Sequence, residues 1–212
     1  MAAHMIADCI IRHSRIGIHK PTHAVFLLHG RGGNSDEMMQ AFLPLVEINK
    51  LVIFSIGPEK EWYPIPNGSN DQEEAVLGLC NNLEKIRSYI SEKISEYEIP
   101  EQNVILIGFS AGAVVALSIV TYLQAPYGMA ISHSGAILDL ERIKNCSVPT
   151  KIKLIHRWDD LCFSWDERYV PMKTTLENKN YNLEFQESGF GNHMVYKNDI
   201  IEIKNWVSDF VS

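Results

Sequence analysis

Apolar and polar positions along the chain follow two alternating patterns. Short apolar runs rich in β-branched residues predict strands at 9–18, 22–28, 51–56, 103–107, 128–132, 151–155 and 183–186, the first as an edge strand. Apolar residues at three- and four-residue spacing predict helices at 36–48, 73–97, 167–178 and 199–211, and another helix follows residue 110 to about residue 123. This alternation predicts an α/β fold with a mostly parallel sheet covered by helices on both faces.

The strongest chemical signal is the stretch Gly108-Phe109-Ser110-Ala111-Gly112, at the junction of a predicted strand and a predicted helix. In this position Gly-x-Ser-x-Gly is the pattern of a nucleophile elbow, a strained turn that lifts the serine hydroxyl off the sheet. The helix N-terminus beside the serine favours developing negative charge. A glycine-rich turn without chemistry has the same local pattern, so the interpretation depends on whether partners for Ser110 exist elsewhere.

A serine hydroxyl is a poor nucleophile until a base takes its proton, and in α/β-hydrolases the base follows the nucleophile and the acid along the chain. Only His133, His156 and His193 follow Ser110. His193 alone also follows a carboxylate placed just after a strand, and it lies in a glycine-rich turn before the last helix. We predict His193 as the base, a structural role for His156, and a place for His133 on the floor of the pocket.

Two adjacent carboxylates, Asp159 and Asp160, compete as the acid that holds the base in its working tautomer. The sequence alone favours neither aspartate clearly as the acid. Asp166 and Glu167 are better interpreted as helix-cap residues. An oxyanion hole needs two backbone N–H groups, and we expect them from the residue after the nucleophile and from the glycine-rich loop 29–33. These are the N–H groups of Ala111 and Arg31. Neither a Walker motif nor G-x-G-x-x-G is present to make this loop a phosphate-binding site.

Composition narrows the class of protein further. The chain has 212 residues, 46% apolar and 21% charged, and we expect one domain over 5–212. A net charge of −7 argues against nucleic acid or an anionic membrane surface as the main partner. The four cysteines are scattered, without C-x-x-C or zinc-ligand spacing, so we expect reduced thiols, a cytoplasmic location and no metal or other cofactor. We also expect no signal peptide and no stable membrane insertion.

Taken together, these segments resemble the phospholipase/carboxylesterase family of α/β-hydrolases, which includes acyl-protein thioesterases and small carboxylesterases. The matching pieces cover nearly the whole chain in order: Leu-His-Gly-Arg-Gly-Gly-Asn at 28–34, Trp-Tyr at 62–63, Gly-Phe-Ser-Ala-Gly-Ala at 108–113, Ser-Gly at 134–135, 156–160 and His193. The resemblance implies an α/β-hydrolase fold. The family's spacing from a strand-end histidine favours Asp160 as the acid.

Three positions depart from the family pattern. Arg157 replaces the usual glycine after His156, which leaves a shifted loop with Asp159 as the acid open. Asn192 replaces a second glycine before the histidine and bears on the geometry of that turn. Ala111 replaces the usual glutamine but keeps the backbone N–H.

The resemblance implies a serine hydrolase that cleaves carboxylic esters or thioesters through an acyl-enzyme. The chain has no insertion large enough for a lipase-type lid, which favours small or singly acylated substrates. We expect Trp62, Tyr63 and Phe163 to bind the substrate; Ile65, Trp158 and Trp165 are further candidates, with ordinary packing as the alternative for each. The alternative function is a binding or regulatory protein on a hydrolase scaffold that has lost activity. The sequence leaves a homodimer open.

Overall fold

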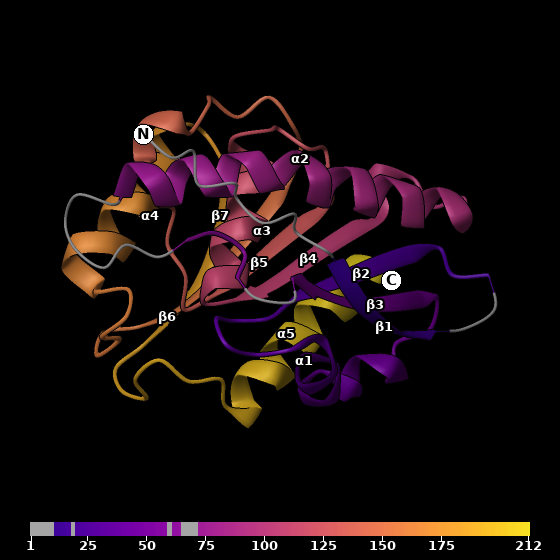
Figure 1. The fold of residues 1–212 in the computed structure, drawn as a ribbon. Helices are drawn as coiled ribbons and strands as arrows, with labels where there is room; N and C mark the ends of the chain where they lie inside the picture. The colour runs from indigo at the N-terminus through magenta and orange to yellow at the C-terminus, as the bar shows by residue number, and fades with distance from the viewer. Residues whose placement is uncertain (1–10, 18–19, 59–60, 65–71) are drawn as a thin grey trace.

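The computed structural model describes residues 11–17, 20–58, 61–64 and 72–212, and these residues form one sheet with helices on both faces (Figure 1). The strands are β1 (Ile11–Gly17), β2 (His23–Leu28), β3 (Leu51–Pro58), β4 (Val104–Phe109), β5 (Met129–His133), β6 (Lys151–Arg157) and β7 (Asn182–Ser188). The helices are α1 (Ser35–Ala41), α2 (Gln72–Glu96), α3 (Ala111–Thr121), α4 (Val170–Asn178) and α5 (Lys197–Val211). Short 3₁₀ segments lie at η1 (Leu43–Glu47), η2 (Glu101–Asn103) and η3 (Leu140–Arg142), and a π-helical turn at η4 (Trp165–Tyr169).

The seven strands of the sheet lie in the order β1-β3-β2-β4-β5-β6-β7. All neighbours are parallel except β1, which pairs antiparallel with β3 at the edge. The chain therefore reverses its direction of travel across the sheet between β3 and β4. In open parallel sheets, ligands bind at the carboxyl ends of strands on either side of such a reversal. The loops that follow β2, β4, β6 and β7 all emerge at this one edge, so residues far apart in the sequence meet there.

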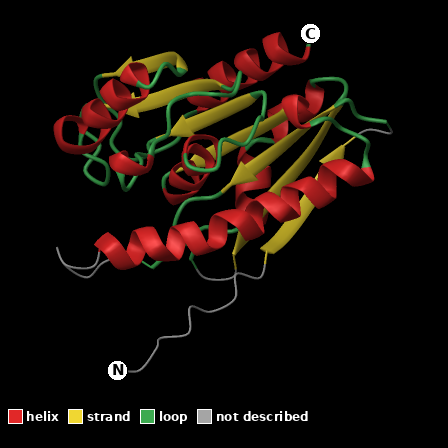
Figure 2. Ribbon diagram, turned by 90° about the horizontal axis from the view of Figure 1, so that it is seen from above, coloured by secondary structure: helices red, strands yellow, loops and turns green. Residues whose placement is uncertain are grey.

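Side chains on the two faces of the sheet enter separate cores. Phe26 and Leu28 of β2 belong to the core that α2, α3 and α4 cover, and Val25 and Leu27 belong to the core under α1 and α5. Figure 1 shows these two layers above and below the sheet, and Figure 2 shows the twisted sheet from above with the long α2 passing over the strands. Because both faces are covered, the central strands are continuous apolar runs, which is the pattern that the sequence shows.

The predicted elements are confirmed with two differences. The helix predicted at 36–48 ends at Ala41 and continues as η1, because Pro44 restricts the residue before it and cannot donate an N–H. The helix predicted at 167–178 begins with the π turn η4, since Pro171 likewise donates no N–H to the turn before it. The predicted edge strand is present as β1; residues 9, 10 and 18 lie outside the described residues. Among the described helices, none has the length and apolar character needed to cross a bilayer.

Helix α3 lies directly against the backbone of two strands at its first turn. A Cβ atom at Gly112 would be 2.1 Å from the carbonyl oxygen of Leu28, and one at Gly108 would be 2.5 Å from the Cα atom of Ala113. Both separations are far below van der Waals contact, and the obstructing atoms belong to the backbone. The two glycines of the predicted elbow are therefore required by the packing of α3 on the sheet.

We expect Gly112→Ala to lower the free energy of unfolding by about 1–3 kcal/mol, because α3 must move away from β2 to make room. Urea denaturation followed by circular dichroism measures this change. Gly189→Ala is the matched control: its nearest neighbours are the Trp158 ring atoms at 3.3 Å, which belong to a side chain, so a change within about 0.5 kcal/mol is expected. Equal midpoints for the two variants would contradict the packing argument.

Candidate active site

Ser110 occupies a strained turn between β4 and α3. Its φ of 54° and ψ of −119° are rare for a residue with a side chain, and such strain persists only where the surroundings enforce it. Here the Ser110 N–H donates to the carbonyl oxygen of His133 at 3.0 Å, and α3 begins at the next residue. The hydroxyl is thereby held above the carboxyl edge of the sheet, as an elbow requires.

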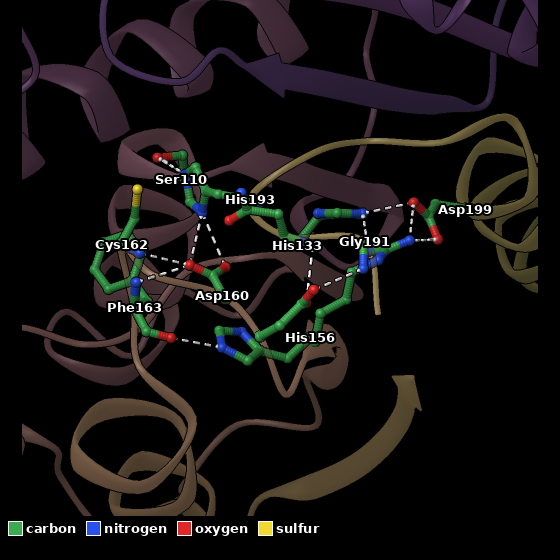
Figure 3. A network of polar contacts seen from close by, with 12 residues as sticks. Ser110, His133, His156, Asp160, Cys162, Phe163, Gly191, His193 and Asp199 are labelled. Atoms are coloured by element: carbon green, nitrogen blue, oxygen red, sulfur yellow. Dashed lines mark hydrogen bonds and ion pairs between the residues drawn. The ribbon is translucent and has the colours of Figure 1, made fainter. Parts of the chain in front are cut away.

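A chain of hydrogen bonds joins Ser110, His193 and Asp160 (Figure 3). The Ser110 hydroxyl donates to His193 Nε2 at 2.8 Å, and His193 Nδ1–H donates to the two carboxylate oxygens of Asp160 at 3.0 and 2.9 Å. The three residues come from the loops after β4, β7 and β6. In this arrangement the imidazole has its lone pair toward the hydroxyl and its proton toward the carboxylate, which is the tautomer that general-base chemistry needs.

Asp160 is buried and oriented by its own loop. Its Oδ1 atom accepts the N–H groups of Cys162 and Phe163, each at 2.9 Å, in addition to the bond from His193. Burial raises the pKa of this carboxyl, but the hydrogen bonds from His193 and the two N–H groups lower it by more, so the pKa lies below its ordinary value. The carboxylate is therefore charged at neutral pH and fixed in direction.

Asp159 points to the backbone of the histidine turn instead of the ring. Its carboxylate accepts the N–H groups of Gly191 at 3.1 Å and Asn192 at 2.8 Å, and these bonds lower its pKa. Asn192 adopts φ 53°, a left-handed conformation that asparagine tolerates better than most residues, and its side-chain oxygen accepts the His193 N–H at 2.8 Å. The two adjacent aspartates thus have different partners. At position 192, asparagine adopts the positive φ for which the family pattern has a glycine.

A buried ion cluster lies behind the histidine turn. The guanidinium of Arg157 donates to both carboxylate oxygens of Asp199, at 2.9 and 2.8 Å, and His133 Nε2–H donates to the same carboxylate at 3.0 Å. All three side chains are buried. Burial lowers the pKa of His133 by more than the Asp199 carboxylate raises it, so Arg157 supplies the positive charge of the cluster. The prediction that His133 lies on the pocket floor is therefore wrong. His133 is buried against Asp199 and packs against Phe109, and it is Phe109 that lines the pocket.

Arg157 also supports the turn that carries His193. Its guanidinium stacks 4.8 Å from the Tyr196 ring, and the Tyr196 hydroxyl donates to the carbonyl oxygen of Gly191 at 2.9 Å. A Cβ atom at Gly191 would be 2.3 Å from Arg157 Nε, and Gly191 has φ 145°, so this position needs glycine. The arginine that replaces the family's glycine at 157 thus packs beneath the turn and leaves Asp160 facing the imidazole.

A pocket of about 830 Å³ opens beside Ser110. Tyr63 and Phe163 line it as predicted. The other described lining residues are Arg31, Gln72, Ala75, Phe109, Ser110, Ala111, Leu138, Cys162, Arg168, His193, Met194 and Val195.

The other predicted wall residues lie elsewhere. Trp62 is buried outside the pocket wall, where its indole N–H donates to the carbonyl oxygen of His29 at 2.8 Å and so holds the loop after β2. Trp158 and Trp165 pack edge to face against each other away from the pocket. Ile65 lies outside the described residues. His156 stacks on Tyr169 with ring centroids 4.3 Å apart and donates to the carbonyl oxygen of Phe163 at 2.8 Å, which is the structural role expected for it.

The residues expected to form the oxyanion hole flank the serine. Ala111 is the first residue of α3, where an N–H has no carbonyl partner within the helix. Arg31 lies in the loop after β2, and both residues line the pocket. The loop approaches closely, because a Cβ atom at Gly30 would be 3.2 Å from the Ser110 Cβ atom and 2.9 Å from the Phe109 ring. Both segments thus lie beside Ser110.

Sequence reasoning missed the apolar residues Leu138, Met194 and Val195 and the thiol of Cys162 on the pocket wall. Proximity in sequence to Asp160 and His193 would have identified Cys162 and Met194. Partial burial of the thiol and the Asp160 charge raise the pKa of Cys162 above its ordinary value. Among the described residues, the one cluster with the ligand types of a metal site is Asp160, Cys162 and His193.

Comparison with solved structures shows the fold. The chain superposes on esterase PE8 with a TM-score of 0.82 at 16% identity, covering 94% of this chain and 99% of that one. The carboxylesterase of Bacillus cereus gives 0.78 at 20% identity with 96% of each chain covered. The phospholipase/carboxylesterase of Dyadobacter fermentans gives 0.77 at 20% identity, covering 94% of this chain and 97% of that one. The predicted α/β-hydrolase fold is confirmed.

Curated relatives include two yeast proteins named acyl-protein thioesterase 1. The protein of Candida albicans is 28% identical over 131 residues, which are 53% of this chain and 56% of that protein. The protein of Debaryomyces hansenii is 32% identical over 75 residues, which are 35% of this chain and 32% of that protein. The chain thus spans about half the length of the first relative and a third of the second.

The family model described as Phospholipase/Carboxylesterase matches residues 15–209, which include the serine elbow, both aspartates and the histidine turn. The chain belongs to the phospholipase/carboxylesterase family.

Proposed function

We propose that this protein hydrolyses carboxylic esters or thioesters through an acyl-enzyme on Ser110, with His193 as the base and Asp160 as the acid. The observation that carries the proposal is the hydrogen-bonded series from the Ser110 hydroxyl through His193 to the buried Asp160 carboxylate, beside an 830 Å³ pocket. Family membership supports the same reaction class. The complete series of hydrogen bonds counts against the alternative of an inactive binding protein.

The proposed reaction has two halves. His193 Nε2 takes the proton of Ser110 as Oγ attacks the carbonyl carbon, and Asp160 stabilises the imidazolium that forms. The N–H groups of Ala111 and Arg31 donate to the oxyanion of the tetrahedral intermediate. His193 then gives its proton to the leaving oxygen or sulfur, which departs and leaves the acyl group on Oγ. Water, activated by the same imidazole, releases the acid in the second half.

The substrate proposed is small or singly acylated. Tyr63, Phe163, Leu138 and Met194 give the pocket an apolar wall that suits one acyl chain. The names of the yeast relatives favour thioesters among the candidates. We further propose that residues 5–212 act as one domain, since all described strands share one sheet, and that it works in the cytoplasm, where thiols such as the unpaired Cys80, Cys146 and Cys162 stay reduced.

Ser110→Ala should lower hydrolysis of p-nitrophenyl butyrate by at least about four orders of magnitude, because no acyl-enzyme can form. The wild-type protein should react with a fluorophosphonate probe at one site, found by mass spectrometry on Ser110, and the variant should not. Activity should survive EDTA, since no step uses a metal ion. Wild-type turnover in the variant would refute the nucleophile, and failure of the native protein to label would favour the binding-protein alternative.

The two aspartates give a matched pair of variants that differ by one position. Asp160→Asn should lower kcat by about four orders of magnitude, because the amide no longer holds the imidazole in its working tautomer. Asp159→Asn should lower it by less than about tenfold, or roughly 1.4 kcal/mol of barrier, because the amide oxygen still accepts one N–H of the histidine turn. The opposite ranking in p-nitrophenyl ester assays would show that Asp159 is the acid.

Substrate size is tested with a series of soluble p-nitrophenyl esters and an emulsified long-chain triglyceride. We expect kcat/KM to be highest for soluble esters of one acyl chain and low on the emulsion, because the part of the chain that the structure describes has no insertion that could act as a lid. A jump in rate when the substrate forms droplets would overturn this proposal while leaving the catalytic residues unaffected.

A further inference from the structure

Three metal-ligating side chains of different chemistry converge at the pocket. A carboxylate oxygen of Asp160, the Sγ atom of Cys162 and a ring nitrogen of His193 all lie within 4.8 Å of one another. Cys162 is exposed, lines the pocket and is a free thiol. Figure 3 shows its sulfur on the side of the loop that faces Ser110. We propose that this cluster binds a zinc-type divalent ion, and that the bound ion reversibly inhibits the enzyme.

The donor set fits this class of ion. Thiolate, imidazole and carboxylate are the three protein ligands that zinc uses, whereas magnesium and calcium select oxygen donors. Bond lengths of about 2.0–2.3 Å place tetrahedral ligands roughly 3.5 Å apart, so the cluster has to contract by about an ångström. Rotation of the exposed Cys162 side chain supplies that movement. The open pocket leaves room for water as the fourth ligand.

The loop already sets two of the donors side by side. The Cys162 N–H donates to Asp160 Oδ1, which fixes the thiol-bearing residue next to the carboxylate. Oδ1 also accepts from Phe163 and His193, whereas the one bond described for Oδ2 comes from His193. Oδ2 is therefore the oxygen with free lone pairs for an ion. The sequence has no motif with the spacing of zinc ligands. The three donors come together because the loops that follow β6 and β7 meet in the fold.

An ion at this place stops the proposed reaction whichever nitrogen of His193 it takes. On Nε2 it occupies the lone pair that accepts the Ser110 proton. On Nδ1 it displaces the proton that faces Asp160; that proton moves to Nε2, which then can no longer accept the Ser110 proton. In either case the Cys162 thiol releases its proton to solvent as the sulfur binds. The inhibition rests on the hydrolase function proposed above; the binding of the ion does not.

The binding experiment uses Co²⁺ as a spectroscopic substitute for zinc. A cobalt–thiolate bond gives a charge-transfer band in the near ultraviolet, and we expect it in the wild-type protein and in Ser110→Ala, because the serine is not a ligand. Cys162→Ala and Cys162→Ser should lack the band. Cys80→Ser and Cys146→Ser, which change thiols away from the pocket, are the matched controls and should keep it. Absence of the band in the wild-type protein, or its persistence in both Cys162 variants, would overturn the proposal.

The inhibition experiment titrates Zn²⁺ against ester hydrolysis, with each rate divided by the same variant's rate in EDTA. We expect inhibition at micromolar Zn²⁺, full recovery on adding EDTA, and no effect of equal Mg²⁺. Cys162→Ala should raise the half-inhibitory concentration at least about tenfold, whereas the two control variants match the wild type. Equal inhibition of Cys162→Ala would show that zinc acts elsewhere. A cobalt–thiolate band in a protein without esterase activity would support the ion site and contradict the hydrolase proposal instead.

Discussion

The geometry of the site depends on how closely the first turn of α3 approaches the backbone of β2 and β4. Because Gly112 and Gly108 have no side chains, the helix begins immediately after the strand, and the intervening Ser110 is forced into a strained conformation with a φ of 54°. A looser junction would let the serine relax into an extended or helical backbone and turn its hydroxyl away from His193. The strain at one residue is thus maintained by close packing over the whole contact between α3 and the sheet.

Beside this serine, two adjacent carboxylates hold different parts of the histidine turn. The chain turns after β6, where the Asp160 N–H donates to the carbonyl oxygen of Arg157, so Asp160 reaches the imidazole ring and Asp159 reaches the backbone that carries it. One sets the tautomer and orientation of the ring, and the other sets the position of the turn. These hydrogen bonds hold the loops after β6 and β7 together. Arg157 stacks on the Tyr196 ring, and the Tyr196 hydroxyl bonds the backbone of the histidine turn.

The sequence predicts the features that rest on local signals. Strand runs, helix periodicity and the Gly-x-Ser-x-Gly junction depend on neighbours within a few residues. Chain order pointed to His193, which the structure places within hydrogen-bond distance of Ser110. The choice between Asp159 and Asp160 depends on where the loop turns, which the residues themselves left even. Trp62 and His133 were misplaced because an aromatic residue near a site can face the pocket or the core, and burial decides that only once the sheet is assembled. The pair of Arg157 and Asp199, 42 residues apart, has no local pattern at all.

The buried pair of Arg157 and Asp199 also bears on how the protein is made. Arg157 belongs to β6, and its counter-charge arrives with α5, which follows every other described element along the chain. A charge buried without its partner is costly, so β6 and the histidine turn cannot adopt their final packing until α5 has docked. On the ribosome, Ser110, Asp160 and His193 would all have been synthesised before that happens. The packing behind the histidine turn therefore depends on a helix that is synthesised after every residue of the candidate site.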